Sequence, residues 1–284
     1  MCSEMSSQGT NSAFCDRLIT CRKHKDYGET ATRADQSSLD WWSKDKTAPR
    51  DFSAYMHNSD NKKQLIRFLL DQWKTQEYAA LIGDRVVYYV CESNCFKLQQ
   101  DAGKMTAVEV SELQSSQEEA DTRIVLHCVF ESCRCAEDGV IVVRSPDTDV
   151  LVLMVYFSWK IQRTLLFDTG AGNKRRLMNV TQLAASIGQD VAKALPSLHA
   201  FTGSDCTSAF MPLPYSLMKR NTAFINTFSA LGDSATTIPS ELHIQLQTFV
   251  CAMYGRPAEH RVNKVRIEIF QVRFGANHFS RFLP

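Results

Sequence analysis

Two aspartates spaced two residues apart are the side chains of this sequence best placed to do chemistry. Asp147 and Asp149 stand in Ser-Pro-Asp-Thr-Asp, directly after the apolar run 140–144. We expect that run to be a strand of an open parallel sheet, and such sheets bind ligands beyond the carboxyl ends of their strands. The same sequence is also typical of a turn that caps the following helix. The spacing alone therefore leaves a ligand site and a capping turn both open.

A second acidic segment, Glu119-Ala120-Asp121, lies in a predicted helix. Helical spacing places Asp121 on a face whose other members are apolar: Ile124, Val125 and Cys128. A buried carboxylate is costly without a cation or strong donors, so this position favours a site. Arg123 is expected on another face of the helix. Glu119 is equally suited to complement the positive end of the helix dipole.

Two more aspartates follow predicted strands. Asp205 comes after Thr202-Gly203-Ser204, and Gly203 permits a sharp turn that would aim Asp205 at the same sheet edge. Asp168 lies in Asp-Thr-Gly, which is as typical of a hairpin turn as of a catalytic site. An aspartic-protease interpretation is disfavoured, because the second half of such a site is missing and the surrounding pattern is not all-β.

Carboxylates gathered from several strand ends favour hard cations such as Mg²⁺ or Mn²⁺. Two such ions can stabilise both the attacking water and the leaving oxygen in phosphodiester hydrolysis. The basic sequence Lys174-Arg175-Arg176 would hold a phosphate backbone by charge, with a solvated basic turn as the alternative. Acidic residues concentrate in 101–149 and basic residues in 170–220, although the net charge is only +1. This segregation suits a metal site beside a polyanion, or a solvated surface.

The sequence opens with polar residues and no signal peptide, so its ten cysteines are expected to be thiols in a reducing compartment. The predicted location is intracellular, nuclear or cytoplasmic, and not secreted. The apolar stretch 150–159 is too short to span a bilayer, so no membrane partner is predicted. Zinc is disfavoured because the possible ligands are irregularly spaced: Cys91, Cys95, His127, Cys128, Cys133 and Cys135.

The elements that must position these residues alternate between strand and helix patterns, which indicates an α/β fold. Predicted strands cover 85–91, 140–144, 163–168 and 198–202. Predicted helices cover 60–78, 181–195, 215–231 and 240–253, besides the helix that carries Asp121. The apolar run 150–156 fits either a helix or a strand.

The 284 residues are 44% hydrophobic, which is enough to build a sizeable core. The segment 1–58 is polar and is expected to be a loosely ordered leader without an apolar strand. One α/β domain is expected at 59–284, and its part from about 212 to 284 is predicted to be helical.

Three segments, taken in order, resemble a large group of uncharacterised animal proteins that look derived from mobile elements: 117–123 (Gln-Glu-Glu-Ala-Asp-Thr-Arg), 144–151 (Arg-Ser-Pro-Asp-Thr-Asp-Val-Leu) and 198–205 (Leu-His-Ala-Phe-Thr-Gly-Ser-Asp). This resemblance covers most of residues 60–284. The short motifs are in turn similar to those of the PIN-like superfamily, which includes flap endonucleases and related 5′-nucleases. That similarity implies a three-layer α/β/α fold with a mainly parallel central sheet. It also implies five metal ligands: Glu119, Asp121, Asp147, Asp149 and Asp205.

The chain departs from this pattern at three places. PIN-like nucleases begin with a strand that ends in a metal-binding aspartate, and the sequence predicts no such strand in 1–58. Ser204 stands where the relatives have cysteine, and Met211-Pro212-Leu213-Pro214 replaces a turn rich in Gly and Lys. The chain also ends where the relatives continue. It therefore resembles a partial member of the group.

These observations predict a divalent-metal-dependent nuclease domain that acts on DNA or RNA. The five acidic residues are the predicted catalytic and metal-binding set, and Lys174, Arg175 and Arg176 are the predicted nucleic-acid contacts. The alternative is a catalytically inactive domain of transposon origin that binds nucleic acid or protein. An RNase H-like transposase is disfavoured, because there an acidic strand comes first and a carboxylate helix last.

Overall fold

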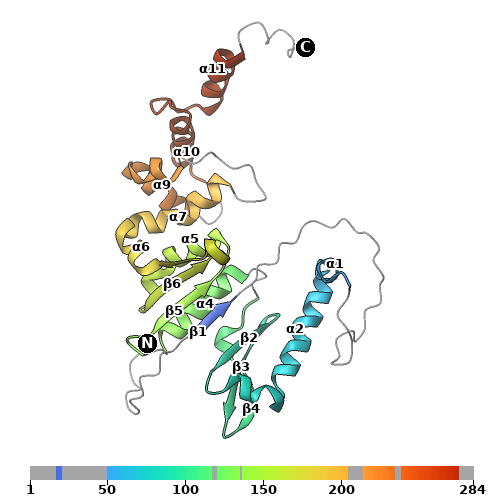
Figure 1. Cartoon of the computed structure of the whole chain (residues 1–284). Helices are drawn as coiled ribbons and strands as arrows, with labels where there is room; N and C mark the ends of the chain where they lie inside the picture. The colour runs from blue at the N-terminus through green and yellow to red at the C-terminus, as the bar shows by residue number, and fades with distance from the viewer. Residues whose placement is uncertain are drawn as a thin grey trace. The chain divides into compact units, whose positions relative to one another are not determined.

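The structure is a computed structural model that describes residues 50–116, 120–134, 136–203, 214–233 and 238–274, with the backbone of 17–20 (Figure 1). It has an α/β fold, as predicted. Its strands form two sheets with the orders β1-β5-β6-β7 and β2-β3-β4. Two compact units divide the chain. The first takes its residues from 1–146, 161–163 and 168–175, and the second from 147–160, 164–167 and 176–284.

The first unit contains a short strand, an antiparallel meander and several helices. In chain order they are β1 (Arg17–Thr20), α1 (Phe52–Tyr55), α2 (Ser59–Trp73), η1 (Gln76–Tyr78), α3 (Ala79–Ile82), β2 (Val87–Cys91), β3 (Asn94–Asp101), β4 (Lys104–Glu109), η2 (Ser111–Leu113), α4 (Ala120–Ser132) and β5 (Val140–Arg144). A further short helix, η4 (Gly172–Lys174), also belongs to this unit.

A side-chain cap and a tight turn explain where α2 begins and where β3 turns back into β4. Asn58 caps α2, because its side chain accepts a hydrogen bond from the backbone N–H of Asp60 at 2.8 Å. The turn between β3 and β4 contains only Ala102 and Gly103, and both have positive φ, at 46° and 79°. Two-residue hairpins of this kind match the right-handed twist of the strands they join.

The sheet β2-β3-β4 packs against α2 on one face and α4 on the other. On the first face, Tyr89 stacks edge-on against Trp73 and donates a hydrogen bond to the backbone oxygen of Ile66. On the second face, Tyr88 meets the rings of His127 and Phe130. Successive strand residues point to opposite faces, so neighbouring tyrosines serve two different helices.

The expectation of a leader without a strand is wrong at one place. β1 lies within the segment 1–58 and pairs in parallel with β5, with Arg17 opposite Ile141 and Thr20 opposite Arg144 (Figure 1). A strand of four residues is too short to show a clear alternation of apolar and polar side chains. Its identity as a strand therefore depends on its partner.

The second unit is largely helical. Its elements are α5 (Thr148–Phe157), η3 (Ser158–Lys160), most of β6 (Thr164–Thr169), β7 (Arg176–Asn179), α6 (Val180–Ile187), α7 (Gln189–Thr202), α8 (Pro214–Lys219), α9 (Thr222–Asp233), α10 (Ser240–Met253) and α11 (Val262–Phe274). An aromatic cluster forms its core. Phe228 and Phe249 are fully buried with ring centroids 4.8 Å apart, and Phe201 packs against both.

Several predicted elements differ from the observed ones. The predicted strand 198–202 is the last part of α7, because that helix continues through Pro196. The predicted helix 181–195 is two helices separated at Gly188, whose φ is 83°. The ambiguous run 150–156 is helical, within α5. The strands β3, β4 and β7 were not predicted, whereas α11 lies in the part 212–284 that was predicted to be helical. No helix in the described part of the chain is both long and apolar enough to cross a bilayer.

Candidate functional site

Asp147 is the N-cap of α5, which follows directly after β5. Its Oδ1 atom accepts a hydrogen bond from the backbone N–H of Asp149 at 3.0 Å. The capping interpretation of this turn is therefore confirmed. The cap also places two carboxylates on the first turn of one helix, where the unpaired N–H groups and the helix dipole favour negative charge.

Asp149 is joined to a side chain from a distant part of the sequence. Oδ1 of Asp149 lies 2.8 Å from Nε2 of His199, which comes from α7. Both side chains are about one-third exposed, at 37% and 31%. The pair is therefore a solvent-accessible carboxylate–imidazole site in which one helix terminus meets a second helix.

His199 has no predicted role from the sequence, although it lies in one of the segments that carry the resemblance. Fifty residues separate it from Asp149. Periodicity indicates which face of a helix is buried, but it does not indicate which second helix that face meets. Only the packing of α5 against α7 could identify this pair.

Asp121 is buried in α4, as predicted, and so are Ile124, Val125 and Cys128. Arg123 is also buried. It donates hydrogen bonds to the backbone oxygens of Glu92 and Ser115. Arg123 thus holds two loops against α4. Asp121 belongs to the first unit, whereas Asp147 and Asp149 belong to the second.

Two predicted ligands, Glu119 and Asp205, lie outside the described residues. Within the described ranges, no group of three or more His, Cys, Asp or Glu side chains is arranged to hold a metal ion. The described part of the chain thus joins Asp149 to His199, with Asp147 two residues before Asp149 as the cap of α5. It supplies two carboxylates of the predicted set at one helix terminus.

Asp168 has the environment of a structural residue. It is only 2% exposed, and Arg175 binds both of its carboxylate oxygens, with Arg144 at 3.7 Å as a second cation. The hydrogen bond from Arg175 and the charges of both arginines lower the pKa of Asp168 below its ordinary value. An aspartate neutralised in this way is a poor candidate for catalysis.

The same ion pair changes the interpretation of the basic sequence. One edge of the Arg175 guanidinium is occupied by Asp168, and this pairing raises the pKa of Arg175. Arg175 therefore has a structural partner inside the protein. Lys174 in η4 and Arg176 in β7 are exposed. These two side chains retain the exposure that a phosphate contact requires.

The described cysteines are free thiols, and most of them are buried: Cys91, Cys95, Cys128 and Cys251. Burial raises the pKa of Cys95 to about 11. Such thiols remain protonated at neutral pH and are poor nucleophiles. Cys133 is exposed, and Cys135 lies outside the described residues.

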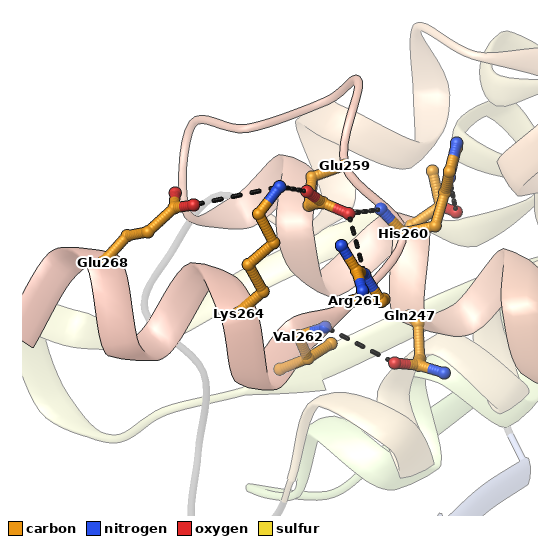
Figure 2. Close-up of polar contacts among 8 residues, drawn as sticks. Gln247, Glu259, His260, Arg261, Val262, Lys264 and Glu268 are labelled. Carbon is orange, nitrogen blue, oxygen red and sulfur yellow. Dashed lines mark hydrogen bonds and ion pairs between the residues drawn. The ribbon is translucent and has the colours of Figure 1, made fainter.

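A separate network of charges orders the connection between α10 and α11 (Figure 2). The Glu259 carboxylate accepts hydrogen bonds from the backbone N–H of His260 and from Nζ of Lys264, and Arg261 lies 3.7 Å away. These partners lower the pKa of Glu259 to about 2. The charged groups of this network are paired with one another, so we interpret the network as stabilising the loop between α10 and α11.

Comparison of the chain with protein-family models, with curated proteins and with solved structures finds no match.

Proposed function

We propose that this chain is a nuclease-like domain that hydrolyses phosphodiester bonds of DNA or RNA with the help of Mg²⁺ or Mn²⁺. One observation carries the proposal: Asp149, on the first turn of α5, is held by His199 from α7 at 2.8 Å. Asp147 stands beside it as the cap of the same helix. Two segments that are distant in the sequence thus meet at Asp149, two residues after Asp147.

The donor chemistry of this pair fits the proposed cations. Carboxylate oxygens are the ligands that Mg²⁺ and Mn²⁺ prefer, and each ion needs further ligands from protein or water. Asp205, which the sequence predicts as a further ligand, remains part of the proposal. The bound ion would lower the pKa of a water molecule and stabilise the charge that develops on the phosphate.

The residues of the chain would act around that ion. Asp147 and Asp149 would bind it, and the N-terminal end of α5 would also attract the phosphate by its unpaired N–H groups. Lys174 and Arg176 would contact the backbone of the nucleic acid by charge. The fold proposed for this site is a PIN-like, three-layer arrangement with a mainly parallel sheet. The parallel pairing of β1 with β5 supports it.

The test uses single-stranded and flap substrates of DNA and RNA with Mg²⁺ or Mn²⁺. The informative variant is Asp147→Asn with Asp149→Asn, because Asn is as good a helix cap as Asp but carries no charge. We expect cleavage by the wild type and none by this variant. The matched control changes two exposed carboxylates on the first turns of other helices, Asp190→Asn and Glu241→Gln, and should cleave normally.

The alternative is an inactive interaction domain of transposon origin. One observation favours it: the carboxylates of Asp147 and Asp149 already make structural hydrogen bonds to a backbone N–H and to His199. A wild-type protein that binds the substrates but cleaves none of them with either cation would establish this alternative and overturn the nuclease proposal.

A further inference from the structure

The contact between His199 and Asp149 has a defined direction. An ionised carboxylate can only accept hydrogen bonds, so Nε2 of His199 carries the hydrogen and donates it to Oδ1 of Asp149. In the neutral imidazole this assignment leaves Nδ1 as an acceptor. The direction of the hydrogen bond restricts the rotation of the Asp149 carboxylate about its last side-chain bond.

The core of the second unit fixes the helix that carries His199. Leu198, the preceding residue, is buried in the aromatic cluster, and Phe201 packs edge-on against Phe228 at 5.6 Å. α7 and α9 also approach closely, since a Cβ atom at Gly232 would lie only 2.7 Å from Oγ of Ser197. Hydrophobic packing therefore sets the position of His199 independently of its hydrogen bond to Asp149.

The first turn of α5 fixes the other partner. The backbone N–H of Asp149 is bound by the Asp147 cap, and the next residue, Val150, is 1% exposed. The backbone of Asp149 is thus held from both sides, and its side chain is held by His199. A carboxylate ordered in this way loses little further conformational freedom when it binds a ligand.

We propose that His199 is a positioning residue that orients the Asp149 carboxylate for a divalent cation. This inference rests on the proposed function, because it assumes that Asp149 binds the metal. His199 acts through Asp149 and is not itself assigned a contact with the ion. Residues that orient the ligands of a metal in this manner typically change its affinity by about 10-fold to 100-fold when they are replaced.

The experiment measures Mn²⁺ affinity by calorimetric titration, without any substrate. His199→Ala removes the donor, whereas His199→Gln retains an N–H group near the position of Nε2. We expect His199→Ala to weaken Mn²⁺ binding by about 10-fold or more and His199→Gln to recover most of that loss. The matched control is His243→Ala, which removes an exposed histidine from α10 in the same unit.

The possible results distinguish the positioning role of His199 from the binding of metal by Asp149. Equal affinity of wild type and His199→Ala would overturn the positioning role but leave the metal site intact. Equal weakening by the Ala and Gln variants would also overturn it, because a loss that the donor does not rescue is a packing effect. A wild-type protein that does not bind Mn²⁺, or binds it as well as Asp149→Asn does, would overturn the proposed function and this inference together. Thermal unfolding of each variant would confirm that it is folded.

Discussion

Arg175 holds Asp168 by two parallel hydrogen bonds, with Nε 2.9 Å from Oδ1 and Nη2 2.8 Å from Oδ2. Both residues flank the turn that follows β6. Paired N–H donors match the geometry of a carboxylate, so the contact fixes direction as well as charge. Arg175, which the sequence predicted to contact phosphate, therefore stabilises a turn within the first unit.

Replacement of Asp168 by Asn should destabilise the protein at neutral pH, because Arg175 and Arg144 would lose their counter-ion. The pKa of Asp168 is lowered in the folded state, so its contribution is complete above its unfolded value near 3.8. That contribution is lost as the pH falls through the folded value. Melting temperatures at pH 7 and pH 3 would check this, and an Asp168→Asn protein as stable as wild type at pH 7 would contradict it.

Gly170 should not tolerate a side chain. Its φ is 80°, and a Cβ atom there would lie 2.3 Å from the backbone oxygen of Lys174. Gly172 in the same turn also has positive φ, at 51°, but open space around it. We expect Gly170→Ala to cost about 2–4 kcal/mol of unfolding free energy and Gly172→Ala only about 1 kcal/mol. Denaturant unfolding would measure both, and equal costs would contradict the predicted clash.

His127 should make stability depend on pH in the mildly acidic range. Burial and, to a smaller extent, the charge of Arg123 lower its pKa from 6.5 to about 4. Nε2 of His127 has no hydrogen-bond partner among the described residues. The unfolded chain therefore binds a proton between about pH 6.5 and pH 4 that the folded chain does not. Stability should fall as the pH decreases through this window, by up to about 1.4 kcal/mol per pH unit.

The variant His127→Leu would remove this titrating group and flatten the dependence between pH 6.5 and pH 4. Urea unfolding at a series of pH values would measure the slope. His57→Leu is the control, because His57 is exposed on the surface of the same unit. An unchanged slope in His127→Leu would show that another group is responsible.

Glu259 should stabilise the connection between α10 and α11 at neutral pH. The hydrogen bonds from Lys264 and from the backbone of His260 lower its pKa from 4.5 to about 2. Glu259→Gln should therefore lower the melting temperature above pH 4.5, and the difference from wild type should shrink as the pH falls toward 2. Glu268→Gln is the control, since Glu268 lies 3.9 Å from Lys264. An equal effect of both variants would contradict a specific role for Glu259.

Local sequence determined much of the secondary structure and part of the candidate site. The apolar run 140–144 is a strand, as predicted, and the turn at Asp147 caps the helix that follows. The buried face of α4 around Asp121 and the start of β6 near residue 164 were also predicted. These features depend on contacts between residues a few positions apart, which periodicity and capping preferences record directly.

Only the tertiary structure determined which residues that are distant in the sequence come into contact. It paired His199 with Asp149, directed Arg123 toward the carbonyl of Glu92, and gave β5 a strand partner within 1–58. It also kept 198–202 helical, because Leu198 and Phe201 join the aromatic core of the second unit. Each of these outcomes is decided by the free energy of packing distant surfaces together. That free energy depends on the three-dimensional neighbours of a residue, which the local pattern of a single sequence does not specify.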